Sequence, residues 1–138
     1  MTSRADAGRG GVEAGASGDA PPRATPVVAV VKDLFFVARI RETARLVGVP
    51  LDVVRTTEDA ERLPGIDARL VLLDLTGGFD YERVFQALER APNAPVLGFT
   101  THALARQTQP WHTRCRRVVT KETLTQELPA LLRDGLPT

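Results

Sequence analysis

Four short apolar segments of this sequence are each followed by a polar residue that could take part in chemistry. Asp33, Asp74, Thr100 and Lys121 stand in this order at the ends of the segments. If the segments are parallel strands, their carboxyl ends meet at one edge of a sheet, where open parallel sheets bind ligands. Carboxylates that converge there hold a Mg²⁺, which neutralises a phosphoryl donor while one carboxylate attacks phosphorus. A lysine and a hydroxyl then bind the oxygens of the acyl phosphate.

The segments before these residues have the composition of buried strands. Residues 27–31 are apolar throughout, as expected of a central strand that is covered on both faces. The other expected strands lie at residues 51–55, 69–73, 94–99 and 116–119.

Between the expected strands, apolar residues recur at helical spacing. Asp33 is the expected N-cap of a first helix that Gly48 and Pro50 end. Further helices are expected at residues 57–63, at 79–90, at 102–109 with Pro110 ending it, and from Thr123, where residues 123–126 match a capping box. Strands that alternate with helices predict an α/β fold, in which a five-stranded, doubly wound parallel sheet forms the middle of three α/β/α layers.

One folded domain is expected after an N-terminal tail. Residues 1–25 are rich in Gly and Ala and contain a single branched aliphatic residue, Val12. Such a segment buries too little apolar surface to offset its ordering entropy, so we predict a disordered tail at 1–25 and the domain at 26–135. The single cysteine, Cys115, excludes an intrachain disulfide and is expected to be buried or half-buried. No apolar run approaches the roughly 18 residues of a membrane helix, and we predict a cytoplasmic protein.

The polar residues at the strand ends resemble those of the receiver domain of two-component response regulators, over residues 26–135. Residues 72–75 (Leu-Leu-Asp-Leu) look like the phosphoacceptor turn, residues 95–100 like the fourth strand with its switch hydroxyl, and Thr120-Lys121 like the strand-five lysine. The resemblance implies a flavodoxin-like, CheY-like fold with strand order 2-1-3-4-5. It also implies that Asp74 is the phosphoacceptor, that Thr100 and Lys121 bind the phosphoryl group, and that Asp33 and Asp74 ligate Mg²⁺. Movement of Thr100 toward the phosphoryl group would reshape the adjoining face, which makes a two-state switch.

The sequence departs from the receiver pattern at Lys32. Receivers usually carry an acidic residue at this position, so one metal-ligating carboxylate is missing and a positive charge is added. We therefore expect no cofactor or only weak Mg²⁺ binding, and the Lys32 ammonium could pair with Asp33 and Asp74 in place of the metal. The departure favours an atypical receiver, or pseudo-receiver. For either aspartate alone, a helix cap or turn residue would be the simpler interpretation.

These observations predict a stand-alone signalling module that acts by protein–protein interaction, without conventional Mg²⁺-dependent phosphorylation of Asp74 and without enzymatic activity. Two alternatives remain. One is a conventional single-domain response regulator that a histidine kinase phosphorylates at Asp74. The other is an oligomeric scaffold that does not switch.

His102 and His112 have no carboxylate or cysteine at ligand spacing between them and are interpreted as surface residues.

Positive charge is concentrated in one stretch of the chain. The net charge is only +1, yet residues 90–121 contain six basic residues and no acidic one. In a receiver-like arrangement this stretch covers the fourth helix and fifth strand, the usual output and dimerisation face of receivers. The expected interaction residues on it are Arg106, Trp111, Arg114, Arg116 and Arg117. The expected partner is an acidic protein surface, on another protein or on this chain itself. A second copy of the chain is also an expected partner. A solvated edge that discourages aggregation is the other interpretation, and nucleic acid is not expected because no recognition helix accompanies the charge.

Overall fold

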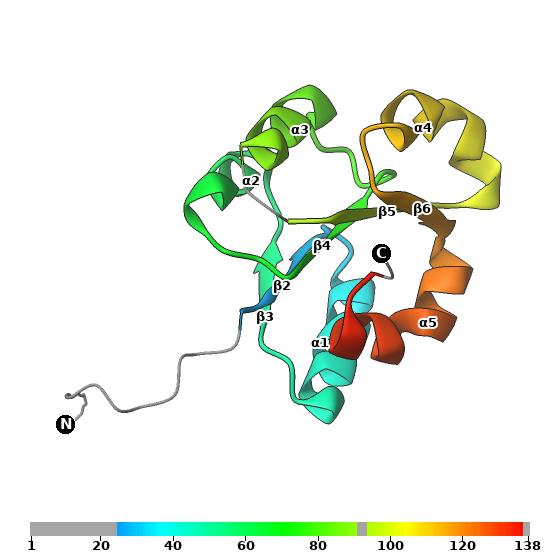
Figure 1. The fold of residues 1–138 in the computed structure, drawn as a ribbon. Coiled ribbons are helices and arrows are strands. Elements are labelled where there is room, and N and C mark those ends of the chain that lie inside the picture. Colours follow the sequence, from blue (N-terminus) through cyan, green and yellow to red (C-terminus); the bar gives the residue numbers. More distant parts are fainter. Residues whose placement is uncertain (1–24, 91–93, 137–138) are drawn as a thin grey trace.

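Helices cover both faces of a five-stranded parallel sheet in the structure, a computed structural model that describes residues 25–90 and 94–136 (Figure 1). The strands are β2 (Val27–Val30), β3 (Leu51–Val54), β4 (Leu70–Asp74), β5 (Val96–Thr100) and β6 (Arg117–Thr120). The α-helices are α1 (Leu34–Val47), α2 (Thr57–Ala60), α3 (Tyr81–Glu89), α4 (Ala105–His112) and α5 (Lys121–Asp134), and short 3₁₀ turns lie at Leu63–Gly65 and His102–Leu104.

The strand order confirms the predicted topology. The sheet runs β3-β2-β4-β5-β6, which is 2-1-3-4-5 along the chain. Asp74 is paired with Phe99 in the β4–β5 register, and Thr100 with Thr120 in the β5–β6 register. All strands point the same way, so their carboxyl ends share one edge of the sheet.

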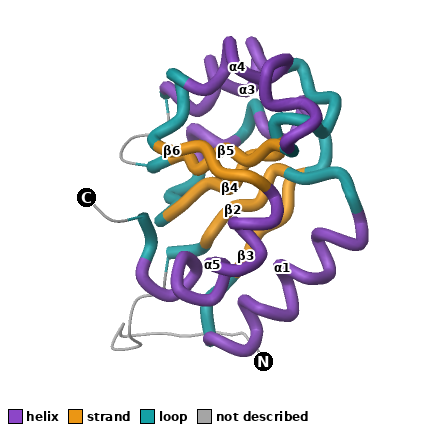
Figure 2. The backbone as a smooth tube through the Cα atoms, turned by 90° about the vertical axis from the view of Figure 1, so that its right-hand side faces the viewer, coloured by secondary structure: helices purple, strands orange, loops and turns teal. Residues whose placement is uncertain are grey.

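Two hydrophobic layers hold the sheet between its helices. Helices α1 and α5 lie on one face, and α2, α3 and α4 lie on the other (Figures 1 and 2). Strand β2 explains how one apolar segment serves both layers: Val27 and Ala29 belong to the core beneath α1 and α5, whereas Val28 and Val30 belong to the opposite core. Alternation of side chains along a strand produces this division, which is why a central parallel strand is apolar throughout.

The first helix begins and ends where the sequence predicts. The Asp33 side chain accepts hydrogen bonds from the amides of Phe35 and Phe36, and Gly48 follows the helix at φ 73°. A left-handed residue at this position satisfies the last carbonyls of the helix, and glycine adopts it without steric strain.

Several expected helix boundaries are wrong, and three of them have a clear physical reason. Helix α4 continues to His112 with Pro110 inside it, because the half-buried Trp111 packs on the core beneath and holds the last turn in place. Helix α5 begins at Lys121 and its N-cap is Thr120, whose hydroxyl accepts from the amide of Thr123. The expected helix at 57–63 is divided into α2 and the 3₁₀ turn, since Pro64 cannot donate a helical hydrogen bond.

Three further predictions concern the N-terminal tail at 1–25, the burial of the Cys115 thiol and the lack of a membrane-spanning helix. Residues 1–24 of the expected tail lie outside the described residues. Cys115 is half-buried, as predicted, and burial raises its pKa to about 11. Within residues 25–90 and 94–136, no helix has both the length and the apolar character needed to cross a membrane.

Candidate functional site

The structure places the four predicted site residues at the carboxyl edge of the sheet. Asp74 and Thr100 are the last residues of the adjacent strands β4 and β5. Asp33 lies between β2 and α1, and Lys121 is the first residue of α5, directly after β6. Parallel pairing thus brings together side chains that are up to 88 residues apart in the sequence.

Asp33 and Lys121 form an ion pair across this edge. Lys121 Nζ lies 3.2 Å from Asp33 Oδ2, while Asp33 Oδ1 accepts the amides of Phe35 at 2.9 Å and Phe36 at 3.3 Å. The hydrogen bond from Lys121 is the main cause that lowers the pKa of Asp33, and the amide of Phe36 adds to it. Both oxygens of Asp33 are therefore engaged by groups of the protein itself.

Asp74 is buried and one of its oxygens is held by the following turn. Its Oδ1 accepts hydrogen bonds from the Thr76 amide at 2.8 Å and the Thr76 hydroxyl at 2.7 Å. Within the described part of the chain, no donor forms a hydrogen bond with Asp74 Oδ2. Gly77 lies close to this oxygen, since a Cβ at Gly77 would be 3.4 Å from it. Asp74 Oδ2 is thus a carboxylate oxygen at this edge that has no hydrogen-bond donor among the described residues.

Lys32 does not pair with either aspartate, contrary to the expected contact. Its ammonium donates to the carbonyl of Gly78 at 3.2 Å and lies 4.8 Å from the centre of the Phe79 ring. The long side chain therefore reaches across the edge to the loop between β4 and α3, where a carbonyl dipole and an aromatic face both attract a cation. Lys121 takes the place beside Asp33 that was expected for Lys32.

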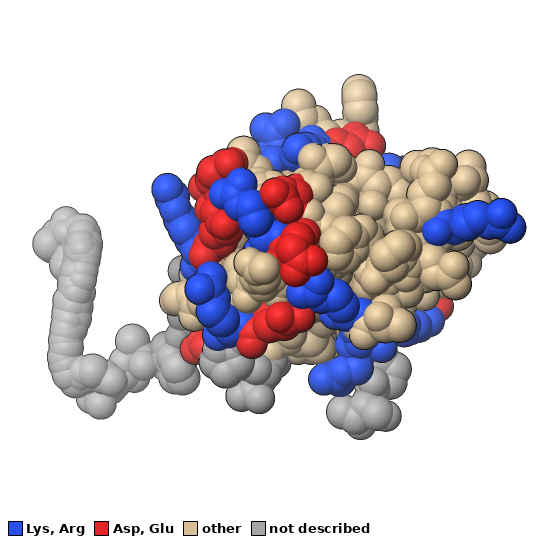
Figure 3. Space-filling view, turned by 90° about the horizontal axis from the view of Figure 1, so that it is seen from above, with Lys and Arg blue, Asp and Glu red and all other residues tan. Residues whose placement is uncertain are grey.

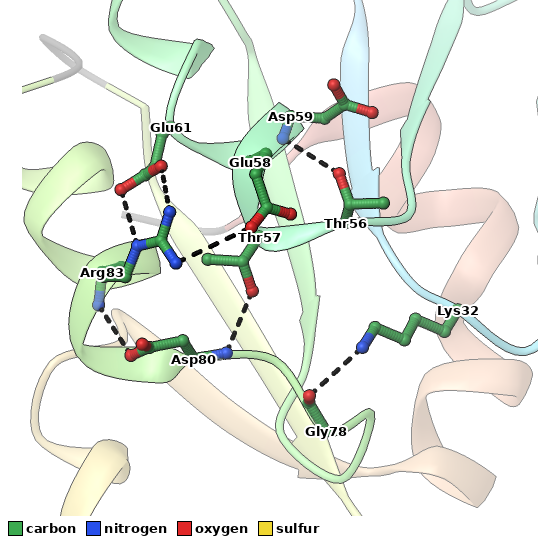
Figure 4. A network of polar contacts seen from close by, with 9 residues as sticks. All are labelled: Lys32, Thr56, Thr57, Glu58, Asp59, Glu61, Gly78, Asp80 and Arg83. Atoms are coloured by element: carbon green, nitrogen blue, oxygen red, sulfur yellow. Dashed lines mark hydrogen bonds and ion pairs between the residues drawn. The ribbon is translucent and has the colours of Figure 1, made fainter.

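The loop after Asp74 is held at several points, of which Figure 4 shows the contacts of Gly78 with Lys32 and of Asp80 with Thr57. The Tyr81 hydroxyl donates to the carbonyl of Asp74 at 2.6 Å and accepts from the amide of Gly77 at 2.8 Å. The amide of Asp80 donates to the Thr57 hydroxyl at 3.0 Å. Burial raises the pKa of Tyr81 to about 12, so its hydroxyl keeps its proton at neutral pH. These contacts hold the loop in one conformation around Asp74.

An ion-paired arginine joins the base of the same loop to α2. Arg83, in the first turn of α3, is hydrogen-bonded to Glu61 through Nε at 2.9 Å and lies 3.7 Å from Glu58 (Figure 4). The sequence did not point to Thr57 or Arg83, because their partners Asp80 and Glu61 are 23 and 22 residues away in the chain. It did not point to Tyr81 either, although its partners Gly77 and Asp74 are only four and seven residues away. An aspartate followed by a threonine two residues later was the one local signal of a turn around Asp74.

The residues at this edge offer few free carboxylate oxygens to a magnesium ion. Mg²⁺ binds protein carboxylates together with waters and substrate oxygens, in near-octahedral geometry. Both oxygens of Asp33 accept hydrogen bonds, Lys32 is positively charged, and Asp74 Oδ2 alone of the four oxygens has no donor among the described residues. Among the described residues, no group of three or more His, Cys, Asp or Glu side chains could hold a metal ion.

Thr100 contacts helix α4. Its hydroxyl oxygen lies 3.0 Å from that of Thr108, which in turn lies 2.8 Å from Nε2 of His112. Thr100 and Thr108 are both buried, with 4% and 5% of their surface exposed. His112 is half-buried and His102 is exposed, so the expected surface position holds fully only for His102.

Trp111 packs inward from the expected interaction face. Its ring stacks on Phe85 at 5.7 Å between centroids with an interplanar angle of 16°, and it lies 5.8 Å from the Tyr81 ring. Trp111 is half-buried against the core beneath α3. Its main contacts are therefore intramolecular.

The arginines of this region divide into two groups. Arg114 pairs with Glu89 at 2.9 Å and Glu82 at 3.2 Å, and Arg117 pairs with Glu127 at 3.3 Å. Arg106 and Arg116 are exposed. Seen from above, charged side chains of both signs gather over α2 and α3, and the part over α4 is mostly uncharged (Figure 3). Ion pairing within the chain thus offsets much of the charge that is concentrated in the sequence.

Comparison with known proteins identifies the fold. No protein-family model matches the chain, and no curated protein matches it at a significant level. The receiver domain of a sensor histidine kinase from Pseudomonas aeruginosa PAO1, solved with magnesium in its active site cleft, is 17% identical over 80% of this chain and 96% of that one, with a TM-score of 0.66. The receiver domain of NtrX from Brucella abortus is 15% identical over 80% and 97%, with a TM-score of 0.65.

Another solved structure has the same fold and a different name. A protein described as adenylate cyclase from Rhodopirellula baltica is 13% identical over 82% of this chain and 87% of that one, with a TM-score of 0.65. Likeness at such low identity concerns the fold, because one fold hosts many functions. With its parallel sheet in the order β3-β2-β4-β5-β6 and helices on both faces, this chain has the CheY-like fold of response regulator receiver domains.

Proposed function

We propose that the chain is a receiver-like signalling module that acts through protein contacts and does not rely on Mg²⁺-assisted phosphorylation of Asp74. The observation that carries the proposal is the occupation of the Asp33 carboxylate, which caps α1 through one oxygen and binds Lys121 through the other. A second cation, Lys32, bridges to Gly78 at the same edge. Positive side chains thus stand where a divalent cation would need free carboxylate oxygens.

Phosphorylation of Asp74 is the second candidate, and the open Oδ2 atom favours it. A carboxylate oxygen without a partner is the nucleophile that phosphoryl transfer requires. In this alternative Lys121 would have to leave Asp33 to bind the phosphoryl oxygens. A histidine kinase would be the partner under this alternative.

Treatment with acetyl phosphate and Mg²⁺ distinguishes the two candidates. We expect intact-mass measurement to detect no phosphoryl group on the wild-type chain, because the metal has too few ligands. The variant Lys32→Asp adds a carboxylate and removes a charge, and we expect it to bind Mg²⁺ at least tenfold more tightly, which corresponds to about 1.4 kcal/mol. Calorimetric titration with Mg²⁺ measures that gain.

The control for this experiment is Asp74→Asn, which retains the shape of the side chain. A phosphoryl mass on the wild type that is lost in Asp74→Asn contradicts the proposal and supports the conventional response regulator. Unchanged Mg²⁺ affinity in Lys32→Asp contradicts the explanation based on Lys32.

The proposed contact surface centres on the exposed guanidinium groups of Arg106 and Arg116. Arg114 and Arg117 already have carboxylate partners, so changing them would also disturb intramolecular ion pairs. We expect the double variant Arg106→Glu/Arg116→Glu to weaken binding to an acidic partner, or self-association, about tenfold or more through like-charge repulsion. Sedimentation at several concentrations measures self-association, and affinity capture with mass-spectrometric identification measures binding to other proteins.

The matched control places the same charge change on another face. Arg39 and Arg41 are exposed on α1, and the variant Arg39→Glu/Arg41→Glu alters net charge by the same amount. Equal weakening by both double variants would show a dependence on net charge, and no weakening by either would remove this surface from the proposal. If no modification or ligand at Asp74 changes the association of the chain, the chain corresponds to the scaffold alternative.

A further inference from the structure

A chain of hydrogen-bonding groups connects the edge of the sheet to helix α4. It begins at Thr100, the last residue of β5, passes through Thr108 and ends at His112, one helical turn further along α4. The two hydroxyl groups are buried, so their protons must be directed to acceptors within the protein. His112 alone of the three can change its charge.

The number of protons restricts how these groups can bond. Each threonine hydroxyl donates one hydrogen bond, and a neutral imidazole carries a proton on only one nitrogen. When His112 carries its proton on Nδ1, Nε2 accepts from Thr108, and the Thr108 oxygen then accepts from Thr100. The Thr100 proton is directed toward α4 in this arrangement.

A proton on Nε2 reverses the direction. Nε2 then donates to the Thr108 oxygen, and the Thr108 hydroxyl donates to the Thr100 oxygen or to the carbonyl of Ala105, which lies 3.2 Å away. When Thr108 donates to Thr100 at 3.0 Å, the Thr100 hydroxyl no longer donates to Thr108 and is available to other acceptors. The imidazolium form has protons on both nitrogens and therefore permits only this second arrangement.

We propose that Thr100, Thr108 and His112 form a hydrogen-bond relay in which protonation of His112 releases the Thr100 hydroxyl from α4. The released hydroxyl can donate to an acceptor at the carboxyl edge of the sheet, where Asp74 ends the neighbouring strand. The relay acts whether or not Asp74 is phosphorylated, so it stands independently of the proposed function. It makes the contact between β5 and α4 sensitive to pH.

Other titratable groups around α4 do not account for such a response, apart from His102. On the elements that pack around α4 they are His102, Tyr81, Glu82, Glu89, Arg106, Arg114, Cys115, Arg116 and Arg117. Arginines stay charged in proteins, and Glu82 and Glu89 are paired with Arg114. Burial raises the pKa values of Tyr81 and Cys115 to about 12 and 11. His102 is therefore the necessary control.

The test follows the backbone amide resonances of Thr100 and Thr101, and the fluorescence of the single tryptophan, Trp111, between about pH 5 and 8, where imidazoles change charge. We expect both signals of the wild type to shift across this range. The variant His112→Gln should lose the shift, and His102→Gln should retain it. A wild type without a shift, or a shift that persists in His112→Gln, overturns the proposal.

Two variants at the middle position distinguish a relay from the direct electric field of the histidine. Thr108→Val keeps the shape and removes the hydroxyl, and Thr108→Ser keeps the hydroxyl. We expect the Thr100 resonances to stop following the His112 titration in Thr108→Val and to continue following it in Thr108→Ser. If Thr100 still follows His112 in folded Thr108→Val, the hydroxyl relay is wrong. Circular dichroism establishes that each variant is folded. If the valine variant is not folded, loss of the shift in folded Thr108→Ser would still contradict the relay.

Discussion

Replacement of Trp111 by alanine is expected to lower the free energy of unfolding by about 3 kcal/mol, within the range for large aromatic residues in cores. Trp111 stacks on Phe85 and lies beside Tyr81, and these rings attach α4 to the core beneath α3. The change removes those contacts and leaves space between α3 and α4. Urea unfolding followed by circular dichroism measures the loss, because the variant has no tryptophan left to report by fluorescence.

Phe35 is the matched control for this large aromatic change. Its side chain is 91% exposed at the start of α1, so Phe35→Ala should change the stability by less than about 0.5 kcal/mol. A Trp111→Ala variant that is as stable as Phe35→Ala would contradict the structural role of Trp111. The residue would then belong to the interaction face, as the sequence had suggested.

The second large effect is expected at Gly98, in the middle of β5. A Cβ at this position would lie 2.8 Å from Cys115 Sγ and 3.0 Å from Leu75 Cδ1, both closer than side-chain carbons normally approach. Gly98→Ala should therefore destabilise the domain by about 1–3 kcal/mol through overpacking. Thermal and urea unfolding measure this loss.

Removal of the neighbouring sulfur provides a specific check on that explanation. In the double variant Gly98→Ala/Cys115→Ala the sulfur no longer blocks the new methyl group, and we expect the loss to be smaller than the sum of the two single losses. Gly65→Ala is the control, since nothing lies within 4 Å of a Cβ there. Strictly additive losses at Gly98 and Cys115 would mean that the sulfur is not the obstacle.

Both predictions concern the packing of β5 and α4 against the core, and these two elements carry the proposed hydrogen-bond relay. Gly98 lies two residues before Thr100, and Trp111 is adjacent to His112. A loosened β5 or α4 would alter the distances of 3.0 Å and 2.8 Å that connect Thr100, Thr108 and His112. These two positions are thus expected to influence signalling indirectly, without contacting a ligand.

Local patterns were sufficient to predict the elements and the sheet. Residues 27–31 were apolar because β2 is covered on both faces, and Asp33 and Gly48 bounded α1 because caps depend on a few neighbouring residues. Where a boundary depended on packing elsewhere, the prediction was wrong. Pro110 does not end α4, since the packing of Trp111 maintains the helix beyond it.

The candidate site was predicted as a set of residues but not as a set of contacts. Asp33, Asp74, Thr100 and Lys121 do lie at the ends of their strands, as the alternation of strands and helices required. Which cation would approach Asp33 could not be predicted, because Lys32 and Lys121 are both long enough to reach it. The ion pairs of the basic stretch could not be predicted from the sequence either. Arg114 and Arg117 are paired with glutamates of α3 and α5.

The sequence by itself determined the fold class, the strand order through its resemblance to receivers, and the four residues at the carboxyl edge of the sheet. The fold class and the four residues depend on periodicity, caps and residue order, which are all local or sequential, whereas the strand order was implied by the resemblance alone. The tertiary structure decided that Lys121 pairs with Asp33, that Lys32 bridges to Gly78, and that Thr100 contacts Thr108 and His112. Such contacts depend on the position and direction of each side chain after the layers have packed, and no pattern of neighbouring residues encodes them.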